Sequence, residues 1–513
     1  MKNLLITFLA LATVAIAEAS TISITVYTTR KQTITGFGAA CCDGAMCPYG
    51  TDTNPVRLLY GPTSKVGFNI MRMEISPNFV GDVIVPEWGD WDTPYDWKGS
   101  LPSAKIVKQR GGIVFGTPWS PPGDYKTNGI AQGGNSEAQG YQKGKLREDC
   151  YDKFFPWLNT FLAYMKDNGV NVDAVSIQNE PDWWVDYSGC LYDPEDLVTL
   201  VKNHAYQLDR ETYNGVKLIS GESLGFTQNF TDPLMNDADC REQIDIVAGH
   251  LYGHAPLEYM KKSAVLAEKY GKEVWMTEHS VSFSDESLPT WHDQLRFAEE
   301  VNECMLAGCT GYIYWYMRAH WAFVSTGEAQ YGEANKTKNK LLPRAFVMSH
   351  FSKNVTGSTR LETSQDENAG RTKEEIPQDY QFSAYQKGDS IIVMAINTTD
   401  NTRDVKITLP YNVKSGQLWL STGNESDKLC QKSDLNDLTE STDIYLYTMP
   451  AQSLSTFIFM VDKGSTAIEN VKESAEDGPK TYYDLHGRRL DNPHGLCIER
   501  STDGSSRKIM MRH

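Results

Sequence analysis

The chain has 513 residues, more than one ordinary domain needs, and this length predicts a large domain with a smaller module. Its 49 Lys and Arg against 66 Asp and Glu give a formal net charge of -17. Nucleic-acid binding relies on clustered Lys and Arg at the phosphates, so this acidic balance argues against nucleic acid as a partner.

The first residues predict export. Lys2 precedes a largely apolar run, Leu4–Ala17, and one residue separates Ala17 from Ala19. A basic start, a short apolar stretch and an Ala-x-Ala exit are typical of a secretory signal peptide, here residues 1–19, with cleavage after Ala17 as an alternative. The run is too short to cross a bilayer of ~30 Å, and no later segment is long and apolar enough. We therefore expect a bacterial protein that is secreted or lies at the cell surface or in the periplasm, without a membrane span.

All 10 Cys follow Ala19. Export permits disulfides, but sequence alone does not assign their pairing. A zinc site at Cys41, Cys42 and Cys47 is an alternative, yet no Cys-x-x-Cys or His pair lies nearby to complete one. We expect no metal.

Short apolar runs alternate with longer amphipathic ones after a β-branched stretch, Thr21–Thr35, that is typical of a strand. The strand-like runs number eight: Gly36–Ala40, Phe68–Ser76, Gly112–Ser120, Val172–Pro181, Val216–Ser223, Ile244–Tyr252, Glu273–Ser280 and Gly311–Met317.

Four stretches between these runs carry apolar residues at helical spacing: Asp149–Asp167, Pro194–Glu211, Pro256–Tyr270 and Trp291–Leu306. Strands that alternate with helices form parallel βα units. Eight such units predict an α/β fold, a closed (β/α)₈ TIM barrel over residues 36–356.

Two carboxylates end strands of this predicted barrel. Glu180 ends the fourth run, in Val175-Ser-Ile-Gln-Asn-Glu-Pro181, and Glu278 ends the seventh, in Val274-Trp-Met-Thr-Glu-His279. Active sites of such barrels are built at the C-terminal ends of the strands. A single Glu there would be interpreted as a solvated strand end, whereas two, each set among Asn, Trp or His, predict a catalytic pair.

Two carboxyl groups suit the hydrolysis of a glycosidic bond. One protonates the departing oxygen, and the other acts as a nucleophile or as a base for water. A separation of ~5–5.5 Å gives retention of configuration and ~6.5–9.5 Å gives inversion, but sequence does not provide this distance.

A wider pattern surrounds the two carboxylates. Its segments are Gly36-Phe-Gly-Ala39, Thr117-Pro-Trp-Ser-Pro-Pro122 with Lys126-Thr-Asn128, Ser176-Ile-Gln-Asn-Glu-Pro181, Thr277-Glu278, Tyr314-Trp-Tyr316 and Ser349-His-Phe-Ser352. Together they resemble glycoside hydrolase family 30, in particular its bacterial, glucuronoxylanase-like xylanase branch. The likeness extends from Thr21 to Lys463.

The resemblance implies a TIM barrel with a fused side β-sandwich domain and a retaining mechanism in which Glu180 is the acid/base and Glu278 the nucleophile. It implies that Asn179 hydrogen-bonds the sugar 2-OH, a contact expected to strengthen in the transition state. Trp119 would be a platform at the bottom of the glycone subsite. Arg72 would orient the nucleophile through a charge-assisted hydrogen bond, with a structural ion pair as the alternative.

The same resemblance implies substrate contacts at strands six and eight. His250 and Tyr252 correspond to residues that flank the nucleophile, and Trp315 and Tyr316 correspond to the wall at strand eight. The implied substrate is a polysaccharide, xylan or a related β-glycan. The chemistry needs no cofactor, and we expect a monomer.

One stretch departs from the family pattern. Glucuronoxylan-specific members carry paired arginines after strand eight, and the second grips the glucuronate branch. Here Trp315-Tyr-Met-Arg-Ala-His-Trp321 places Ala319 in the second position, while Arg318 matches the first. A uronate thereby loses its bidentate anchor, so dependence on glucuronate branches is not expected unless His320 or Lys336 substitutes.

Beyond Gly357 the helical signal fades. Strands separated by polar turns predict a β-sandwich over residues 357–463, and the resemblance implies that residues 20–35 join it. The predicted strands are Tyr380–Tyr385, Ser390–Asn397, Val405–Thr408, Gln417–Ser421, Ile444–Tyr447 and Ser455–Val461. Residues 464–513 are predicted to be a polar linker and a segment that resembles C-terminal sorting modules of Bacteroidetes-type secreted proteins, or else a degenerate appendage.

The sequence therefore favours an endo-acting β-1,4-xylanase that works by double displacement. Alternatives keep the mechanism but change the sugar, to a β-glucosidase, a β-1,6-glucanase or an exo-acting xylobiohydrolase. Loops would decide among them, and the insert Pro86–Trp97, with Trp88 and Trp91, is a candidate subsite wall or barrel cap. The last alternative, a glycan-binding protein on a disused barrel, is disfavoured because both Glu180 and Glu278 are present.

Overall fold

The computed structural model describes residues 21–42, 52–77, 79–80, 83–84, 97–281, 289–333, 336–365, 379–435, 442–463, 481–483, 489–490, 495–500 and 506–511. The predicted signal peptide, Cys47, Trp88, Trp91 and the predicted linker at 464–480 lie outside these described residues. Within them, no helix is long and apolar enough to cross a membrane.

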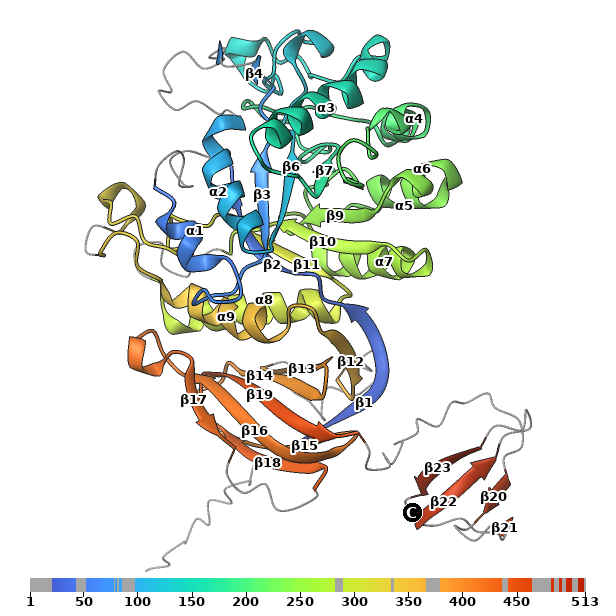
Figure 1. Cartoon of the computed structure of the whole chain (residues 1–513), viewed down its shortest axis with the longest axis vertical. Coiled ribbons are helices and arrows are strands. Elements are labelled where there is room, and N and C mark those ends of the chain that lie inside the picture. Colours follow the sequence, from blue (N-terminus) through green and yellow to red (C-terminus); the bar gives the residue numbers. More distant parts are fainter. Residues whose placement is uncertain are drawn as a thin grey trace, which may run out of the picture.

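Eight parallel strands close into a barrel, in the order β10-β11-β2-β3-β6-β7-β8-β9 (Figure 1). Their bounds are β2 Gly36–Cys41, β3 Ile70–Glu74, β6 Ile113–Thr117, β7 Ala174–Ser176, β8 Lys217–Ile219, β9 Ile246–His250, β10 Glu273–Glu278 and β11 Gly311–Tyr314. Each strand falls on one of the eight predicted runs, so the predicted barrel is confirmed.

Apolar side chains fill the barrel, as expected for a packed core rather than a pore. They come from all strands except β2: Ile70, Phe115, Ala174, Ile219, Ile246, Ala248, Trp275 and Ile313. In β2 the backbone itself lies close to β3. A Cβ at Gly38 would therefore lie 1.6 Å from the carbonyl oxygen of Ile70. Only glycine fits there.

Helices surround the barrel (Figure 1). They are α1 Asn54–Leu59, α2 Trp97–Gln109, α3 Tyr151–Asp167, α4 Pro194–His204, α5 Gln228–Asn236, α6 Ala238–Gln243, α7 Pro256–Lys269, α8 Trp291–Leu306 and α9 Pro343–Asn354. Helix α8 has the predicted bounds because a capping box fixes its start. The Thr290 side chain accepts from the Asp293 backbone N–H, while Asp293 Oδ2 accepts from the Thr290 backbone N–H at 2.8 Å.

A second sheet of nine strands lies beside the barrel, in the order β17-β16-β19-β14-β13-β12-β1-β15-β18 (Figure 1). Its strands are β1 Ile22–Thr33, β12 Thr359–Thr363, β13 Tyr380–Lys387, β14 Ser390–Asn397, β15 Arg403–Thr408, β16 Asn412–Ser421, β17 Gln431–Asp434, β18 Ile444–Met449 and β19 Ser453–Asp462.

This side sheet folds over on itself along β1. Residues 22–25 of β1 pair with β15, whereas residues 26–33 pair with β12 with register shifts. As a result Tyr447 of β18 packs on Phe457 of β19, with ring centroids 4.9 Å apart, although the two strands are not neighbours in the sheet. The predicted side β-sandwich and the participation of the N-terminal strand are confirmed.

Helices α8 and α9 lie between the barrel and the side sheet (Figure 1). In α8, Asn302 Oδ1 accepts from Ser383 Oγ of β13 at 2.6 Å. In α9, the buried His350 ring bonds Thr456 Oγ1 at 2.8 Å and Ser421 Oγ at 2.9 Å, and burial lowers its pKa to about 3. Buried polar contacts therefore join the two parts.

The described C-terminal residues form strands as well. A four-stranded antiparallel sheet, in the order β21-β20-β22-β23, contains β20 Thr481–Tyr483, β21 Arg489–Leu490, β22 Gly495–Arg500 and β23 Ser506–Met511. The short strands β4 Phe79–Val80 and β5 Val83–Ile84 pair with each other. The sorting role of the C-terminal segment stays a prediction.

Glu299 of α8 lines a cavity of about 680 Å³, and Glu303 and Asp379 line the same cavity. Burial, together with the charges of these two neighbours, raises the pKa of Glu299 to about 7. The folded state therefore binds this proton more tightly than the unfolded chain, and stability is lost as the pH rises from about 4.5 through 7. Glu299→Gln is expected to have a higher Tm than the unsubstituted protein at pH 8 and an equal Tm near pH 4.5.

Thermal melts at the two pH values check this expectation, with Glu268→Gln, at an exposed position of α7, as the matched control. A Tm difference for Glu299→Gln that is the same at both pH values would contradict it.

Candidate active site

Polar side chains meet at the C-terminal ends of the barrel strands, where barrel active sites are built. Glu180 follows β7, Glu222 follows β8, and His250 and Glu278 end β9 and β10. A parallel bridge between Asn179 and Glu222 continues the pairing of β7 and β8 beyond the ends of the two strands.

Glu180 has a left-handed backbone, with φ of +45°. Successive side chains of an extended strand point to opposite faces. The left-handed turn instead lets Asn179 and Glu180 both reach the mouth of the barrel, where the first accepts from Arg72 and the second bonds His250. Backbone bonds hold this conformation, since Asn179 N–H donates to Pro118 O at 2.9 Å and Glu180 N–H to Glu222 O at 2.8 Å. Such conformations cost free energy and cluster at functional sites.

Arg72 of β3 is fully buried beneath the mouth of the barrel. Its Nη1 donates to Glu278 Oε2 at 2.5 Å, and its Nη2 donates to Asn179 Oδ1 at 2.6 Å and lies 3.0 Å from Glu222 Oε2. Burial raises the pKa of the Glu278 carboxyl above its ordinary value, although His250 and Arg72 oppose this effect. The guanidinium thus fixes the Glu278 side chain in one orientation.

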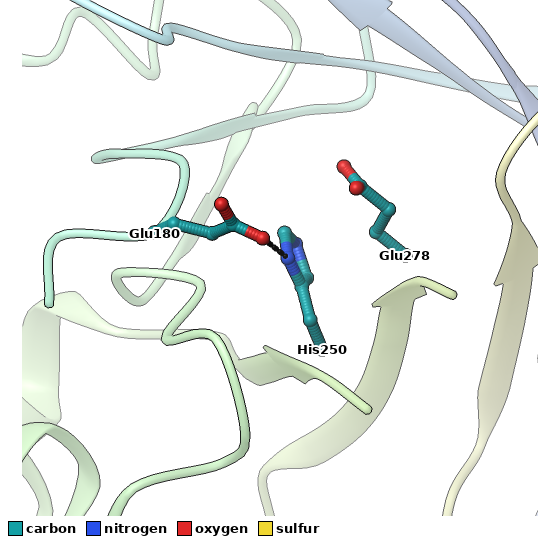
Figure 2. Close-up of side chains that lie close together, drawn as sticks. All are labelled: Glu180, His250 and Glu278. Carbon is teal, nitrogen blue, oxygen red and sulfur yellow. Dashed lines mark hydrogen bonds and ion pairs between the residues drawn. The ribbon is translucent and has the colours of Figure 1, made fainter. Parts of the chain in front are cut away.

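Glu180, His250 and Glu278 point toward one another (Figure 2). One oxygen of each carboxylate and one ring nitrogen of His250 all lie within 4.8 Å of one another. Three such atoms resemble a cation site, but each group already has a partner. Glu180 Oε1 bonds His250 Nδ1 at 2.9 Å, and Glu278 bonds Arg72.

Glu222 is a third buried carboxylate in the same cluster. It accepts from Thr117 Oγ1 at 2.7 Å and lies 3.4 Å from His250 Nε2. Burial alone would raise the pKa of Glu222, but the charges of Arg72 and His250 prevail and lower it to about 2. Burial alone would lower the pKa of His250, but the surrounding carboxylates raise it to about 9. At neutral pH the cluster therefore holds a carboxylate and an imidazolium with hydrogens on both ring nitrogens.

Aromatic rings cover this polar cluster. Trp119 is 8% exposed and lies over the Arg72 guanidinium at 4.6 Å, with its centroid 5.8 Å from that of Trp315. Trp315 in turn contacts Tyr316, with ring centroids 4.3 Å apart. Burial and the nearby carboxylate charges raise the pKa of Tyr252 far above its ordinary value, and Tyr252 hydrogen-bonds Glu278. The structure thus brings the predicted site residues together at one mouth, and their roles remain to be tested.

Comparison with known proteins finds similar glycoside hydrolases. The family model for Glycosyl hydrolase family 59 matches residues 142–335. Glucuronoxylanase XynC of Bacillus subtilis (strain 168) is 26% identical over 409 residues, which are 77% of this chain and 82% of that protein. The solved structure of the glycoside hydrolase family 30 subfamily 8 xylanase Xyn30A from Clostridium acetobutylicum is 29% identical, with a TM-score of 0.66 over 86% of this chain and 100% of that one. The chain is xylanase-like, and it is similar to members of glycoside hydrolase family 30.

A family 30 endoxylanase from Clostridium papyrosolvens C71 agrees, at 25% identity and a TM-score of 0.66 over 86% of this chain and 100% of that one. The family 59 match stops short of the side sheet, whereas these family 30 structures match most of the chain. The protein described here is a glycoside hydrolase.

Sequence reasoning missed some residues at the mouth of this glycoside hydrolase. Glu222 carried a signal, because it stands near the end of the run Val216–Ser223 as Glu180 does in its own run. Tyr187 is 43% exposed, and partial burial together with the charges of Glu180 and Glu278 raises the pKa of its phenol. Trp183 is 50% exposed, and its backbone N–H donates to the backbone carbonyl oxygen of Glu180 at 3.0 Å. Tyr187 and Trp183 belong to a loop without periodic signal.

One candidate subsite residue is not at the mouth of the enzyme. Trp97, proposed from the insert as a subsite wall or barrel cap, is 3% exposed. Its ring packs on Phe161 and Tyr164 of α3, and its Nε1 donates to Ser76 O at 3.1 Å. Trp97 is the first residue of α2, and it is a core residue because its ring packs between α2 and α3.

The structure describes the stretch after strand eight, in which Ala319 follows Arg318. Arg318 lies 3.7 Å from Asp52 and 3.8 Å from Glu328, which gives it two acidic neighbours of its own. Ala319 is fully buried. Lys336 lies over the ring of Trp321, with Nζ 5.1 Å from the centroid.

Proposed function

We propose that this glycoside hydrolase belongs to family 30 and is an exported endo-1,4-β-xylanase that hydrolyses its substrate by double displacement. The approach of Glu180 and Glu278 carries the proposal. One oxygen of Glu180 lies within 4.8 Å of one oxygen of Glu278, an approach compatible with the ~5–5.5 Å carboxyl separation of retaining enzymes. The similar proteins are a glucuronoxylanase and a xylanase, and this supports xylan as the substrate.

In the first step Glu278 attacks the anomeric carbon while Glu180 gives its proton to the departing glycosidic oxygen. The bond from Glu278 to carbon forms as the glycosidic bond breaks. Arg72 supports this step because its charge-assisted bond to Oε2 favours the ionised nucleophile and leaves the other oxygen available for attack. Asn179, held by the same guanidinium, is positioned to meet the sugar 2-OH.

In the second step Glu180 takes a proton from water, and the resulting oxygen attacks the same carbon and releases Glu278. Two inversions give net retention. His250 assists by donating from Nδ1 to Glu180 Oε1 at 2.9 Å, which keeps the carboxyl group in place for both proton transfers.

Branch specificity follows from the stretch after strand eight. Since Ala319 replaces the second arginine, we propose that cleavage does not depend on glucuronate branches. The test is a product profile on glucuronoxylan, linear xylo-oligosaccharides and a β-glucan, with Glu278→Gln as the inactive control. Comparable cleavage of linear and branched xylans is expected. Cleavage only beside glucuronate would contradict branch independence, and activity on β-glucan alone would overturn the xylanase proposal.

Export is part of the same proposal. The intact mass of the protein recovered from its native host is expected to correspond to a chain that begins at Ser20. Recovery of a chain that retains residues 1–19 would contradict export through a cleaved signal peptide.

A further inference from the structure

Glu222 is a carboxylate that the proposed two-carboxylate mechanism does not use. It follows β8 and its side chain has no exposed surface. It accepts from Thr117 Oγ1 at 2.7 Å and hydrogen-bonds Ser176, and it lies 3.0 Å from Arg72 Nη2 and 3.4 Å from His250 Nε2. A buried carboxylate is costly unless it is paired and hydrogen-bonded, and each oxygen here has such partners.

Glu222 touches both residues that hold the catalytic candidates. His250 contacts Glu222 through Nε2 and Glu180 through Nδ1. Arg72 contacts Glu222 through Nη2 and Glu278 through Nη1. Glu222 is therefore connected to Glu180 through His250 and to Glu278 through Arg72.

The charges of the cluster balance only when Glu222 is counted. Arg72 and a protonated His250 supply two positive charges, and ionised Glu222 and Glu278 supply two negative ones. The proposed reaction starts with Glu180 protonated, and in that state the buried cluster is neutral. Without the Glu222 charge it would carry a net positive charge in a site of low dielectric, which is unfavourable.

We propose, on the basis of the proposed function, that Glu222 is a positioning residue that acts through His250 and Arg72. It holds the imidazolium against Glu180 and the guanidinium against Glu278, and it fixes the charge state from which the reaction begins.

The groups that face His250 define the expected pH behaviour. They are Glu180 after β7, Glu222 after β8 and Glu278 of β10, and the ring of Tyr252 lies beside it with centroids 6.1 Å apart. With Glu222 in place these charges raise the pKa of His250 to about 9. Loss of one buried negative charge makes every proton of the cluster easier to remove, so each pKa falls.

Two variants separate the charge of Glu222 from its shape. Glu222→Gln keeps the shape and loses the charge, whereas Glu222→Asp keeps the charge and shortens the side chain. The dependence of kcat/KM on pH is measured with an aryl β-xylobioside, alongside the thermal stability of each variant. In Glu222→Gln both limbs of the profile are expected to move to lower pH by at least about one unit. In Glu222→Asp the limbs are expected to stay in place while kcat falls.

A second measurement needs no substrate. Titration of the ¹⁵N-labelled His250 ring by NMR in the unsubstituted enzyme is expected to show a proton retained to about pH 9, and an earlier loss in Glu222→Gln. Proton loss from His250 near pH 6.5 in the unsubstituted enzyme would overturn the proposal. The proposal would also be overturned if Glu222→Gln and Glu222→Asp both lowered kcat/KM without moving either limb of its pH profile. Because the titration does not depend on xylan, inactivity on xylan would overturn the proposed function without bearing on Glu222.

Discussion

Glu278→Gly is expected to lower kcat on linear xylo-oligosaccharides by roughly 10⁴-fold or more while the protein remains folded. A loss of that size is about 5 kcal/mol of transition-state stabilisation. The reason is that Glu278 is the group placed to form the covalent bond to the sugar. Arg72 holds it there, because Nη1 donates to Glu278 Oε2 at 2.5 Å. Steady-state kinetics beside Glu299→Gln, a glutamate substitution away from the mouth, check this expectation.

Azide distinguishes the two carboxylates by stereochemistry. In Glu278→Gly, azide enters the vacated space and attacks from the side of the lost nucleophile, so an α-glycosyl azide is expected from a β-substrate. In Glu180→Ala, with a leaving group that needs no proton, azide attacks the glycosyl-enzyme and a β-glycosyl azide is expected. Products of the opposite configuration would mean that the two roles are exchanged.

Arg72→Met is expected to reduce kcat/KM by about 10²–10³-fold and to destabilise the fold by about 3–5 kcal/mol. Arg72 is fully buried and is the direct cationic partner of Glu278 and Glu222, so its removal leaves two carboxylates of the buried cluster without that charge. Urea unfolding gives the stability, and kinetics on an aryl β-xylobioside give the activity.

Arg72→Lys is the matched variant, because it keeps the charge and loses the planar fork that reaches Glu278 and Asn179 together. It is expected to recover much of the stability and little of the activity. Near-normal activity in Arg72→Met would instead mean that Arg72 forms a structural ion pair and does not orient the nucleophile.

The barrel was predictable because its strands carry short apolar runs that are buried on both sides. Glu180 and Glu278 were identified because a strand end in a TIM barrel defines a position in space as well as in sequence. The same rule applied to Glu222, but sequence gives no measure of burial. A single additional Glu at a strand end is normally interpreted as a solvated group. Its contacts with Arg72 and His250 emerge only from the closure of the barrel.

Other features had no signal in the sequence. The left-handed φ of +45° at Glu180 occurs at a residue that rarely adopts it, so nothing local indicates the turn. The strand β17 has four exposed residues and no apolar alternation, and it was missed for that reason. Trp97 looked like a cleft residue because its insert is rich in tryptophan, whereas tertiary packing against α3 buries it.

The most direct test of the proposed mechanism is to trap the covalent intermediate. A 2-deoxy-2-fluoro-xylobioside with an activated leaving group slows both steps, but the second more than the first, and peptide mass spectrometry then locates the sugar. We expect a single adduct, on the peptide and residue of Glu278. An adduct on Glu180 or on another residue, or an inverted product released without any adduct, would contradict double displacement through Glu278.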